Sequence, residues 1–313
     1  MKTQQFGSSV HDIQQAARIL ADGGLVAMPT ETVYGLAADA LNDQAVAKIY
    51  DAKGRPSFNP LISHMASAEM AFNYVEWSKA AEKLSIALWP GPMTLILPAK
   101  QGCSISKLAR AGLDSVAIRV PAHPIAQALL SKLGRPVAAP SANPSGRISP
   151  TTKDHVIAGL DGRIDAVIDG GPCEMGIEST IISLLDDPVI LRPGNITTNE
   201  VQSILGHDIT MLNDTGTITA PGQLTSHYAP NASLRLNANT FMQDEKSLGF
   251  GDIRGDLNLS LTANLREATA NLFSMLHELD AREGSKIAVA PIPNHGLGVA
   301  INDRLTRAAA PKN

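Results

Sequence analysis

The sequence predicts an α/β protein of two domains. Short buried strands alternate with amphipathic helices, the alternation is interrupted once by a polar stretch, and it then resumes. The chain has 313 residues, 44% of them hydrophobic and 18% charged, which is typical of a globular protein with a substantial core. We expect a large mixed sheet with flanking helices, followed by a smaller α/β domain.

The first domain is expected to cover residues 1–206. Apolar residues at helical spacing begin at Ile13 and stop before Gly23, which can adopt the left-handed conformation that ends a helix. Asn42 is a candidate cap for a helix through Tyr50. Further helices are predicted over 79–88, 124–133, 152–158 and 199–205, and strands over 25–28, 60–63, 94–97, 116–120, 137–139, 166–168, 180–184 and 189–191.

A polar stretch over residues 207–230 has too little apolar content for a core and is expected to be a linker. Residues 231–313 then show a second α/β pattern, which indicates a smaller domain. Its predicted elements are a helix over 265–279 with one apolar face, a strand over 286–290 and a terminal helix over 299–309.

Composition narrows the class of protein. A net charge of −4 does not favour a nucleic-acid-binding protein, although a local basic cleft is compatible with it. Cys103 and Cys173 lie far apart, which argues against a disulfide framework or a thiolate zinc site and fits a reducing cytoplasm. No secretory signal, no apolar run near the ~20 residues of a membrane helix and no His-Glu-x-x-His motif is present. We therefore expect a cytoplasmic protein with no membrane partner and no metal site built by the protein.

Lys53 and Arg55 flank Gly54 and precede Pro56. In an extended loop, alternate side chains point the same way, so both cations can face one anion. Lysine and arginine match the charge and geometry of phosphate oxygens, which favours a polyphosphate ligand. A solvated basic loop explains an isolated Lys-x-Arg pair as well, so the motif alone does not distinguish a phosphate-binding site from a solvated loop.

Other segments rich in glycine and hydroxyl groups follow buried strands, where α/β proteins place ligands. Residues 141–146 can contact phosphate or ribose oxygens, although the same composition is typical of a simple turn. Arg119 and Arg192 lie in or after strands that are otherwise apolar, and a buried arginine needs either a carboxylate ligand or an internal ion pair. Glu178 is a candidate structural ion-pair partner. No nucleophile with an adjacent base is recognisable.

These residues and their order resemble the Sua5 branch of the YrdC/Sua5 family, the threonylcarbamoyl-AMP synthases. In the first domain the resemblance lies in 29–36, 53–56, 59–61, 141–146, 176–181 and 191–194. Residues 220–222 and 227–230 resemble the interdomain linker of the family, although 223–226 lack its usual basic side chains. Residues 286–293, 296–298 and 300–305 resemble the second, Sua5-type domain. The resemblance implies a YrdC-like twisted mixed sheet followed by a Sua5-type domain.

The resemblance also implies a reaction. L-threonine, bicarbonate and ATP would give threonylcarbamoyl-AMP and pyrophosphate, with Mg2+ bound through ATP. The product would pass to the threonylcarbamoyl transferase machinery that forms threonylcarbamoyladenosine (t6A) at position 37 of tRNAs reading ANN codons, and direct contact with tRNA is a further expectation. Nucleotidyl transfer depends on positioning and charge neutralisation, so a missing nucleophile is consistent with it.

By resemblance, Lys53 and Arg55 are the expected catalytic residues and bind the phosphates of ATP. The implied ATP site also contains Asn59, Ser115, Ser141, Asn143, Ser149, Arg192, His227 and Tyr228. The implied L-threonine site contains Thr32, His64, Arg119, Ala139 and Ser179, with Arg119 on the carboxylate. The linker residues are expected to close over the nucleotide.

Three alternatives remain open at this point. A non-enzymatic RNA-binding protein would use the same cleft as a basic patch, and its affinity would fall steeply with salt. A carbamoyltransferase of the hydrogenase-maturation type would also contain a YrdC-type domain, but it would carry a zinc finger that two cysteines cannot supply. In the third alternative, the second domain alone binds a ligand of its own, although its sequence offers no motif that identifies one.

Overall fold

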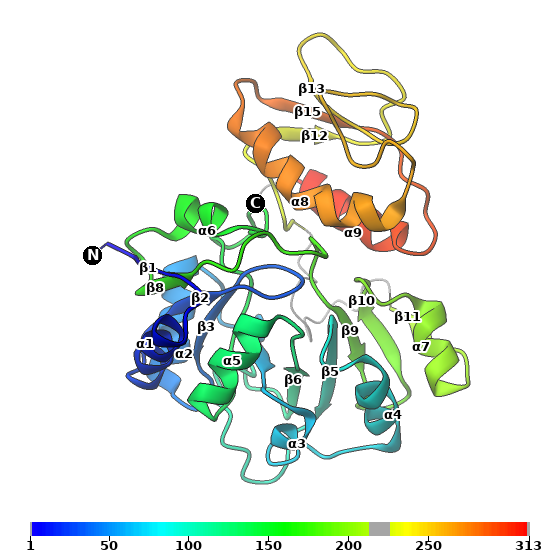
Figure 1. Cartoon of the computed structure of the whole chain (residues 1–313). Helices are drawn as coiled ribbons and strands as arrows, with labels where there is room; N and C mark the ends of the chain where they lie inside the picture. Colours follow the sequence, from blue (N-terminus) through cyan, green and yellow to red (C-terminus); the bar gives the residue numbers. More distant parts are fainter. Residues whose placement is uncertain (1, 213–225, 312–313) are drawn as a thin grey trace.

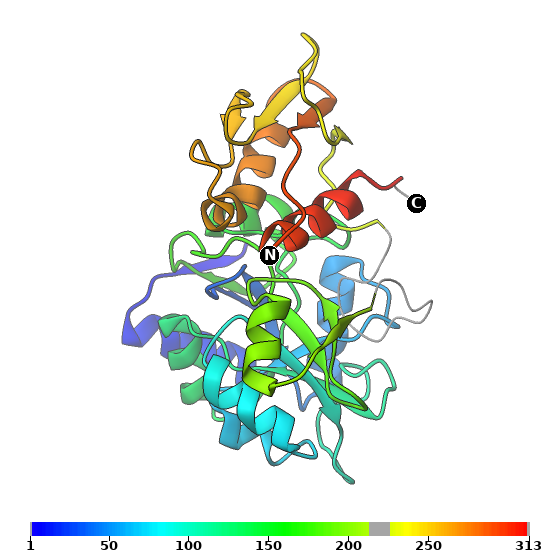
Figure 2. The same ribbon diagram turned by 90° about the vertical axis from the view of Figure 1, so that its right-hand side faces the viewer.

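The computed structural model describes residues 2–212 and 226–311. Within these residues, the first part of the chain forms an eleven-stranded mixed sheet with the order β1-β8-β2-β3-β7-β4-β6-β5-β9-β10-β11. A separate four-stranded parallel sheet with the order β12-β15-β13-β14 follows. The two sheets lie in distinct lobes, one above the other in Figures 1 and 2. The predicted fold class is confirmed.

The strands of the large sheet come from residues 4–211. Their bounds are β1 Gln4–Phe6, β2 Val26–Met28, β3 Gly35–Asp39, β4 Ile62–His64, β5 Met93–Pro98, β6 Ser115–Arg119, β7 Val137–Ala138, β8 Ala166–Ile168, β9 Thr180–Ser183, β10 Val189–Arg192 and β11 Thr210–Met211. β11 lies in the range 207–230 that was expected to be linker, and it pairs with β10. Within that range, residues 213–225 are outside the described residues.

Helices cover both faces of this sheet (Figure 1). Their bounds are α1 Val10–Ala21, α2 Asp43–Lys53, α3 Ala68–Ala71, α4 Lys79–Leu88, α5 Pro124–Leu133, α6 Lys153–Leu160 and α7 Thr198–Leu205. α1 and α5 share one hydrophobic cluster with β2 and β8. α2, α4, α6 and α7 contribute to a larger cluster on the other face, around Tyr34, Ile49 and Leu95. Three layers result.

The second lobe has its own core. It contains β12 Ser233–Arg235, β13 Lys246–Gly249, β14 Leu257–Asn258, β15 Lys286–Val289, α8 Leu265–Ala281 and α9 Gly298–Ala309. Phe273 and Leu276 on α8 are buried with Ile301 on α9, and Ile177 from the first lobe joins the same cluster. The two lobes therefore share apolar packing as well as the polar contacts described below.

The segment that carries Lys53 differs from the prediction. α2 continues through Lys53, and Gly54 caps it with a φ of 60°, in the left-handed region that favours glycine. The expected extended loop over 53–56 is therefore wrong for Lys53, which is the last residue of a helix. The cap Asn42 is confirmed, because its side chain accepts hydrogen bonds from the amides of Gln44 and Ala45.

Candidate active site

One pocket gathers residues from the ends of several central strands and from the segment that joins the two lobes. It holds about 520 Å³ of empty space, a figure that includes open solvent at its mouth. The lining residues are Thr30, Val33, Gly35, Arg55, Ile62, His64, Arg119, Ala139, Pro140, Ser141, Glu178, Ser179, Arg192, His227 and Tyr228. Three arginines, Arg55, Arg119 and Arg192, make the pocket rich in cations.

Lys53 lies beside this pocket at the end of α2. Its Nζ donates a hydrogen bond of 2.6 Å to the carbonyl oxygen of Ser141 and another to the carbonyl oxygen of Asn143. In return, the amide of Ser145 donates to the carbonyl oxygen of Lys53. The pKa of Lys53 lies well below its ordinary value. The main cause is burial, and the nearby charge of Arg55 is the second. The cation is thus fixed against the loop over 141–146.

Arg55 also has only main-chain acceptors. Its guanidinium donates to the carbonyl oxygens of Asn59 at 3.4 Å and Pro60 at 3.1 Å. Burial lowers the pKa of Arg55 to about 10. Across the residues that the structure describes, neither Lys53 nor Arg55 forms an ion pair with a carboxylate. Buried cations without a counter-ion favour binding of an anion.

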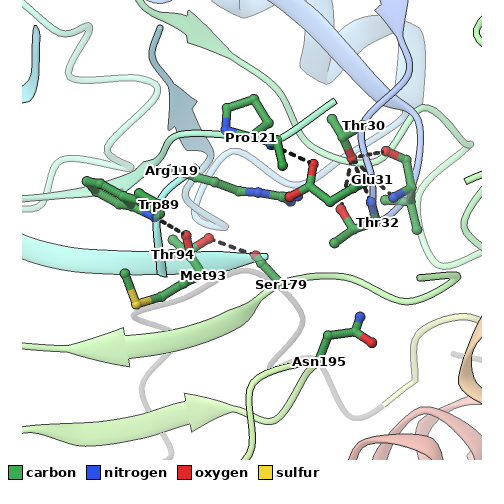
Figure 3. Close-up of polar contacts among 12 residues, drawn as sticks. Thr30, Glu31, Thr32, Trp89, Met93, Thr94, Arg119, Pro121, Ser179 and Asn195 are labelled. Atoms are coloured by element: carbon green, nitrogen blue, oxygen red, sulfur yellow. Dashed lines mark hydrogen bonds and ion pairs between the residues drawn. The ribbon is translucent and has the colours of Figure 1, made fainter. Parts of the chain in front are cut away.

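Arg119, at the end of β6, forms a buried ion pair with Glu31 (Figure 3). The distance from its Nη2 to Glu31 Oε1 is 2.7 Å, and Glu31 Oε2 accepts from the amide of Ala122. The internal ion pair considered for Arg119 is therefore present. However, the Nε of Arg119 is buried and has no hydrogen-bond partner within the described structure. Arg119 thus retains a donor for a ligand carboxylate.

Hydroxyl groups surround Arg119 (Figure 3). Thr30 Oγ1 lies 2.9 Å from Thr32 Oγ1, and Thr30 donates to the carbonyl oxygen of Val33. Ser179 Oγ lies 2.7 Å from Thr94 Oγ1 on β5. Because these four hydroxyl side chains are almost fully buried, they offer a small polar surface that is shielded from water.

His64, at the end of β4, is a neutral member of the pocket. Burial and the charge of Arg119 lower its pKa to about 3. Its Nδ1 lies 3.3 Å from the carbonyl oxygen of Ile62, a contact that favours the tautomer with the proton on Nδ1. In that tautomer Nε2 is a hydrogen-bond acceptor, so His64 does not add positive charge to the pocket.

Glu178 brings a carboxylate into the pocket wall. Its Oε1 accepts from Ser149 Oγ, and its Oε2 accepts from Arg304 on α9 at 2.9 Å. Burial opposes ionisation of Glu178, but the charges of Arg304 and Arg192 outweigh it, so its pKa is lowered. Arg192 itself donates twice to the carbonyl oxygen of Ser179. Glu178 is therefore an ionised and compensated group.

His227 and Tyr228 enter the pocket from the end of the expected linker range 207–230. Tyr228 is 1% exposed, its ring stacks on Phe273, and its hydroxyl has no partner among the described residues. Its φ of 63° is strained for a residue other than glycine, which is typical of functional sites. His227 contacts Tyr228 edge to face, and its pKa is well below the ordinary value because of burial and the charge of Arg55.

The structure brings together most of the residues predicted for the site. Nine of the fifteen line the pocket: Arg55, His64, Arg119, Ala139, Ser141, Ser179, Arg192, His227 and Tyr228. Three others form hydrogen bonds with lining residues, namely Lys53 with Ser141, Ser149 with Glu178 and Thr32 with Thr30. Asn143 lies one contact further away, because its carbonyl oxygen accepts from Lys53.

Asn59 and Ser115 are placed differently. Both amide atoms of Asn59 are buried without a partner within the described structure, but the side chain does not line the pocket. Ser115 begins β6, the strand that Arg119 ends, and it also does not line the pocket. Their roles in binding remain predictions.

Two functional candidates were not predicted as site residues. Glu31 belongs to the segment 29–36, and its separation of 88 residues from Arg119 hid their pairing. Arg304 was part of the segment 300–305 and had no assigned role, because its approach to Glu178 depends on how the two lobes pack. The sequence did contain one signal for Arg304: it is a charged residue on the apolar face of α9, and such a residue needs a buried partner.

Family models match almost the whole chain. A model described as "Telomere recombination" covers residues 18–194, and one described as "Threonylcarbamoyl-AMP synthase, C-terminal domain" covers residues 196–310. A threonylcarbamoyl-AMP synthase of Bacillus subtilis is 40% identical over 98% of this chain and 95% of its own length. The chain belongs to the Sua5 family of threonylcarbamoyl-AMP synthases.

Further Sua5 relatives agree with this assignment. The enzyme of the same name from Pyrococcus abyssi is 38% identical over 95% of this chain and 94% of its own length. A crystal structure of P. abyssi Sua5 complexed with L-threonine aligns with a TM-score of 0.90, covering 99% of this chain and 98% of that one. The expected family membership is confirmed.

The described residues show neither a membrane span nor a metal cluster. None of their helices is long and apolar enough to cross a membrane. Within the same residues, His, Cys, Asp and Glu side chains do not gather in threes at a spacing suited to a metal ion.

Proposed function

We propose that this chain forms threonylcarbamoyl-AMP and pyrophosphate from L-threonine, bicarbonate and ATP. The observation that supports this best is the cationic pocket, which combines Arg55, Arg119 and Arg192 with Lys53 at its wall. A triphosphate and an amino-acid carboxylate are the anions that such a pocket would neutralise.

The proposed reaction has two steps. The neutral amine of threonine attacks the carbon of bicarbonate, a carbamate forms, and water leaves. An oxygen of the carbamate then attacks the α-phosphorus of ATP, and the bond to the β-phosphate breaks with release of pyrophosphate. The protein forms no covalent bond in either step, so its task is to position the reactants and to stabilise charge.

Lys53 and Arg55 would bind the phosphates. Both now donate to main-chain carbonyl oxygens, which are weaker partners than phosphate oxygens. Lys53 is held by two carbonyl groups of the loop over 141–146, so it is positioned before a ligand arrives. Pre-positioned donors contribute more to catalysis than donors that must first be ordered.

Arg119 would bind the carboxylate of threonine through its unpartnered Nε, while Glu31 holds the neighbouring Nη2 of the guanidinium. His64 is neutral, and its Nε2 can accept a hydrogen bond from the hydroxyl of threonine. Thr32 and Ser179 supply further hydroxyls. A site that binds a hydroxyl by hydrogen bonds rejects an analogue that lacks it.

The nucleoside would lie against the linker side of the pocket. His227 and Tyr228 offer aromatic surface there, and Tyr228 has an unpartnered hydroxyl. Asn143 Oδ1 is also buried without a partner within the described structure. Buried polar atoms of this kind are usually satisfied in the working state of a protein.

Mg2+ would enter with ATP. Glu178, which lines the pocket, and Glu31, the partner of Arg119, are both engaged in ion pairs, so oxygen ligands for the cation would come mainly from the phosphates and water. The ion would neutralise charge on the triphosphate.

Downstream of this reaction, the adenylate would serve t6A formation at position 37 of tRNAs reading ANN codons. An acyl adenylate is an activated donor, so a transferase must accept its threonylcarbamoyl group. Direct contact between this chain and tRNA is a separate proposal, and titration of tRNA at two salt concentrations tests it, because phosphate contacts weaken steeply with salt.

Measuring pyrophosphate release while omitting one substrate at a time tests the proposed function. Release should require ATP, L-threonine and bicarbonate together. Release that persists without threonine or without bicarbonate would contradict the proposal, and retention of tRNA without any turnover would support the RNA-binding alternative.

A further inference from the structure

Arg304 is the largest fully buried side chain among the described residues. It lies on α9 of the second lobe, on the face that also buries Ile301 and Leu305. An arginine at such a position requires compensation of its charge. Its partners are Asp303, the adjacent residue, and Glu178, which lies 126 residues earlier in the first lobe.

Glu178 in the first lobe and Tyr228 in the joining segment both contact Arg304, and both line the pocket. Its Nε donates to Glu178 Oε2, and its guanidinium carbon lies 5.1 Å from the centre of the Tyr228 ring. The Nη2 of Arg304 is buried and has no partner within the described structure. Arg304 therefore contacts two residues that line the pocket, but it does not line the pocket itself.

The second lobe also restrains the backbone that carries Glu178. Gly176 has a φ of 73°, and a Cβ at this position would lie 2.4 Å from the carbonyl oxygen of Ala270 on α8. Contact this close is possible only for glycine. The segment 176–179 is thus held by close backbone packing against α8 and by the ion pair with Arg304.

Glu178 creates an electrostatic conflict for an anionic ligand. A carboxylate in a pocket that binds phosphates would repel them, and burial of the pocket would strengthen the repulsion. The ion pair with Arg304 cancels this charge and fixes the carboxylate together with the hydrogen bond from Ser149. The contact therefore matters to ligand binding as well as to the packing of the lobes.

We propose that Arg304 is a positioning residue through which the second lobe completes the nucleotide site: it neutralises Glu178 and supports the ring of Tyr228. This rests on the proposed use of ATP. It gives the second lobe a role in the reaction without requiring that this lobe bind a ligand of its own.

Nucleotide binding to the full-length Arg304→Met, Glu178→Gln and Arg304→Met/Glu178→Gln variants tests the proposal. Calorimetric titration with ATP should show affinity reduced about tenfold or more in Arg304→Met, as expected for an uncompensated charge facing an anion. The double variant should recover most of this loss, because it lacks the repelling carboxylate. Arg282→Met, which removes an exposed ion pair with Glu278 in the same lobe, is the matched control and should bind ATP normally.

If Arg304 served only to pack the two lobes together, the variants would behave differently. The melting temperature would then fall in Arg304→Met, the folded fraction would bind ATP as the wild type does, and Glu178→Gln would restore nothing. That result would overturn the proposal. If Arg304→Met does not fold, Arg304→Lys with and without Glu178→Gln provides the same comparison, with a smaller expected loss. Failure of the wild type to bind ATP would instead contradict the proposed function.

Discussion

Lys53 Nζ lies 2.6 Å from the carbonyl oxygen of Ser141, and this hydrogen bond joins the end of α2 to the loop that follows β7. The contact brings together two segments that are 88 residues apart in the chain. It fixes a buried cation beside a pocket that also contains three arginines.

Replacing Lys53 by methionine should reduce pyrophosphate release by a factor of about 100 or more, because a pre-positioned charge that stabilises the transition state is lost. Lys48→Met is the matched control. Lys48 lies on the same helix and also donates to a main-chain oxygen, that of Gly23, but away from the pocket. Equal rates for both variants and the wild type would remove Lys53 from the mechanism.

Arg119→Gln should raise the KM for L-threonine at least about tenfold, with a smaller effect on the KM for ATP. The variant loses the proposed carboxylate donor and leaves Glu31 without its cation. Arg135→Gln, which interrupts an ion pair with Asp39 elsewhere on the protein, is the control. Initial rates at varied threonine concentration measure this KM. An unchanged KM in Arg119→Gln would show that the ion pair with Glu31 is only structural.

Tyr228→Phe and Tyr34→Phe should have opposite effects. The hydroxyl of Tyr228 has no partner in the described structure, so its removal should leave the melting temperature unchanged and weaken ATP binding severalfold. The hydroxyl of Tyr34 donates to the carbonyl oxygen of Gly171 and accepts from the amide of Gly170, so its removal should destabilise the fold by about 1–3 kcal/mol. Wild-type ATP affinity in Tyr228→Phe would argue against a ligand at this hydroxyl.

Acid should destabilise the protein through histidines that burial, partial for His277 and nearly complete for His64, keeps in the neutral form. Burial, together with the charge of His155, lowers the pKa of His277 to about 4, and burial lowers that of His64 to about 3. Between these values and the ordinary value near 6.5, the unfolded chain binds more protons than the folded one. Stability is therefore present above about pH 6.5 and is lost as the pH falls.

Urea unfolding at several pH values measures this effect. Each such histidine should contribute a slope of about 1.4 kcal/mol per pH unit within its window. In His277→Gln, whose side chain can still donate to the carbonyl oxygen of Ser149, the slope between pH 6 and pH 5 should fall by about that amount. An unchanged slope would show that His277 does not titrate in this way.

Local signals in the sequence predicted the regular elements well. The helices over 79–88 and 124–133 have the predicted bounds, because Ser78 caps the first, and Pro124 and Gly134 delimit the second. The strand β3 was missed, because its residues Gly35–Asp39 partly overlap a segment that was interpreted as a ligand loop. The helical position of Lys53 was missed because the following glycine and proline suggested a loop.

Contacts between distant segments explain what the sequence could not predict. The candidate cations were recognised individually, and the structure places Arg55, Arg119 and Arg192 in one pocket. The ion pairs of Arg119 with Glu31 and of Arg304 with Glu178 join residues 88 and 126 positions apart. No local spacing encodes such pairs, because they depend on strand order and on how the two lobes pack.

Mass spectrometry of the product formed from ATP, L-threonine and 13C-labelled bicarbonate tests the central claim most directly, namely that one pocket joins these three substrates. We predict a threonylcarbamoyl adenylate that carries the label in its carbamoyl carbon, forms only when all three substrates are present, and is nearly absent with Lys53→Met. An unlabelled adenylate, or AMP formation that is independent of threonine, would contradict the account.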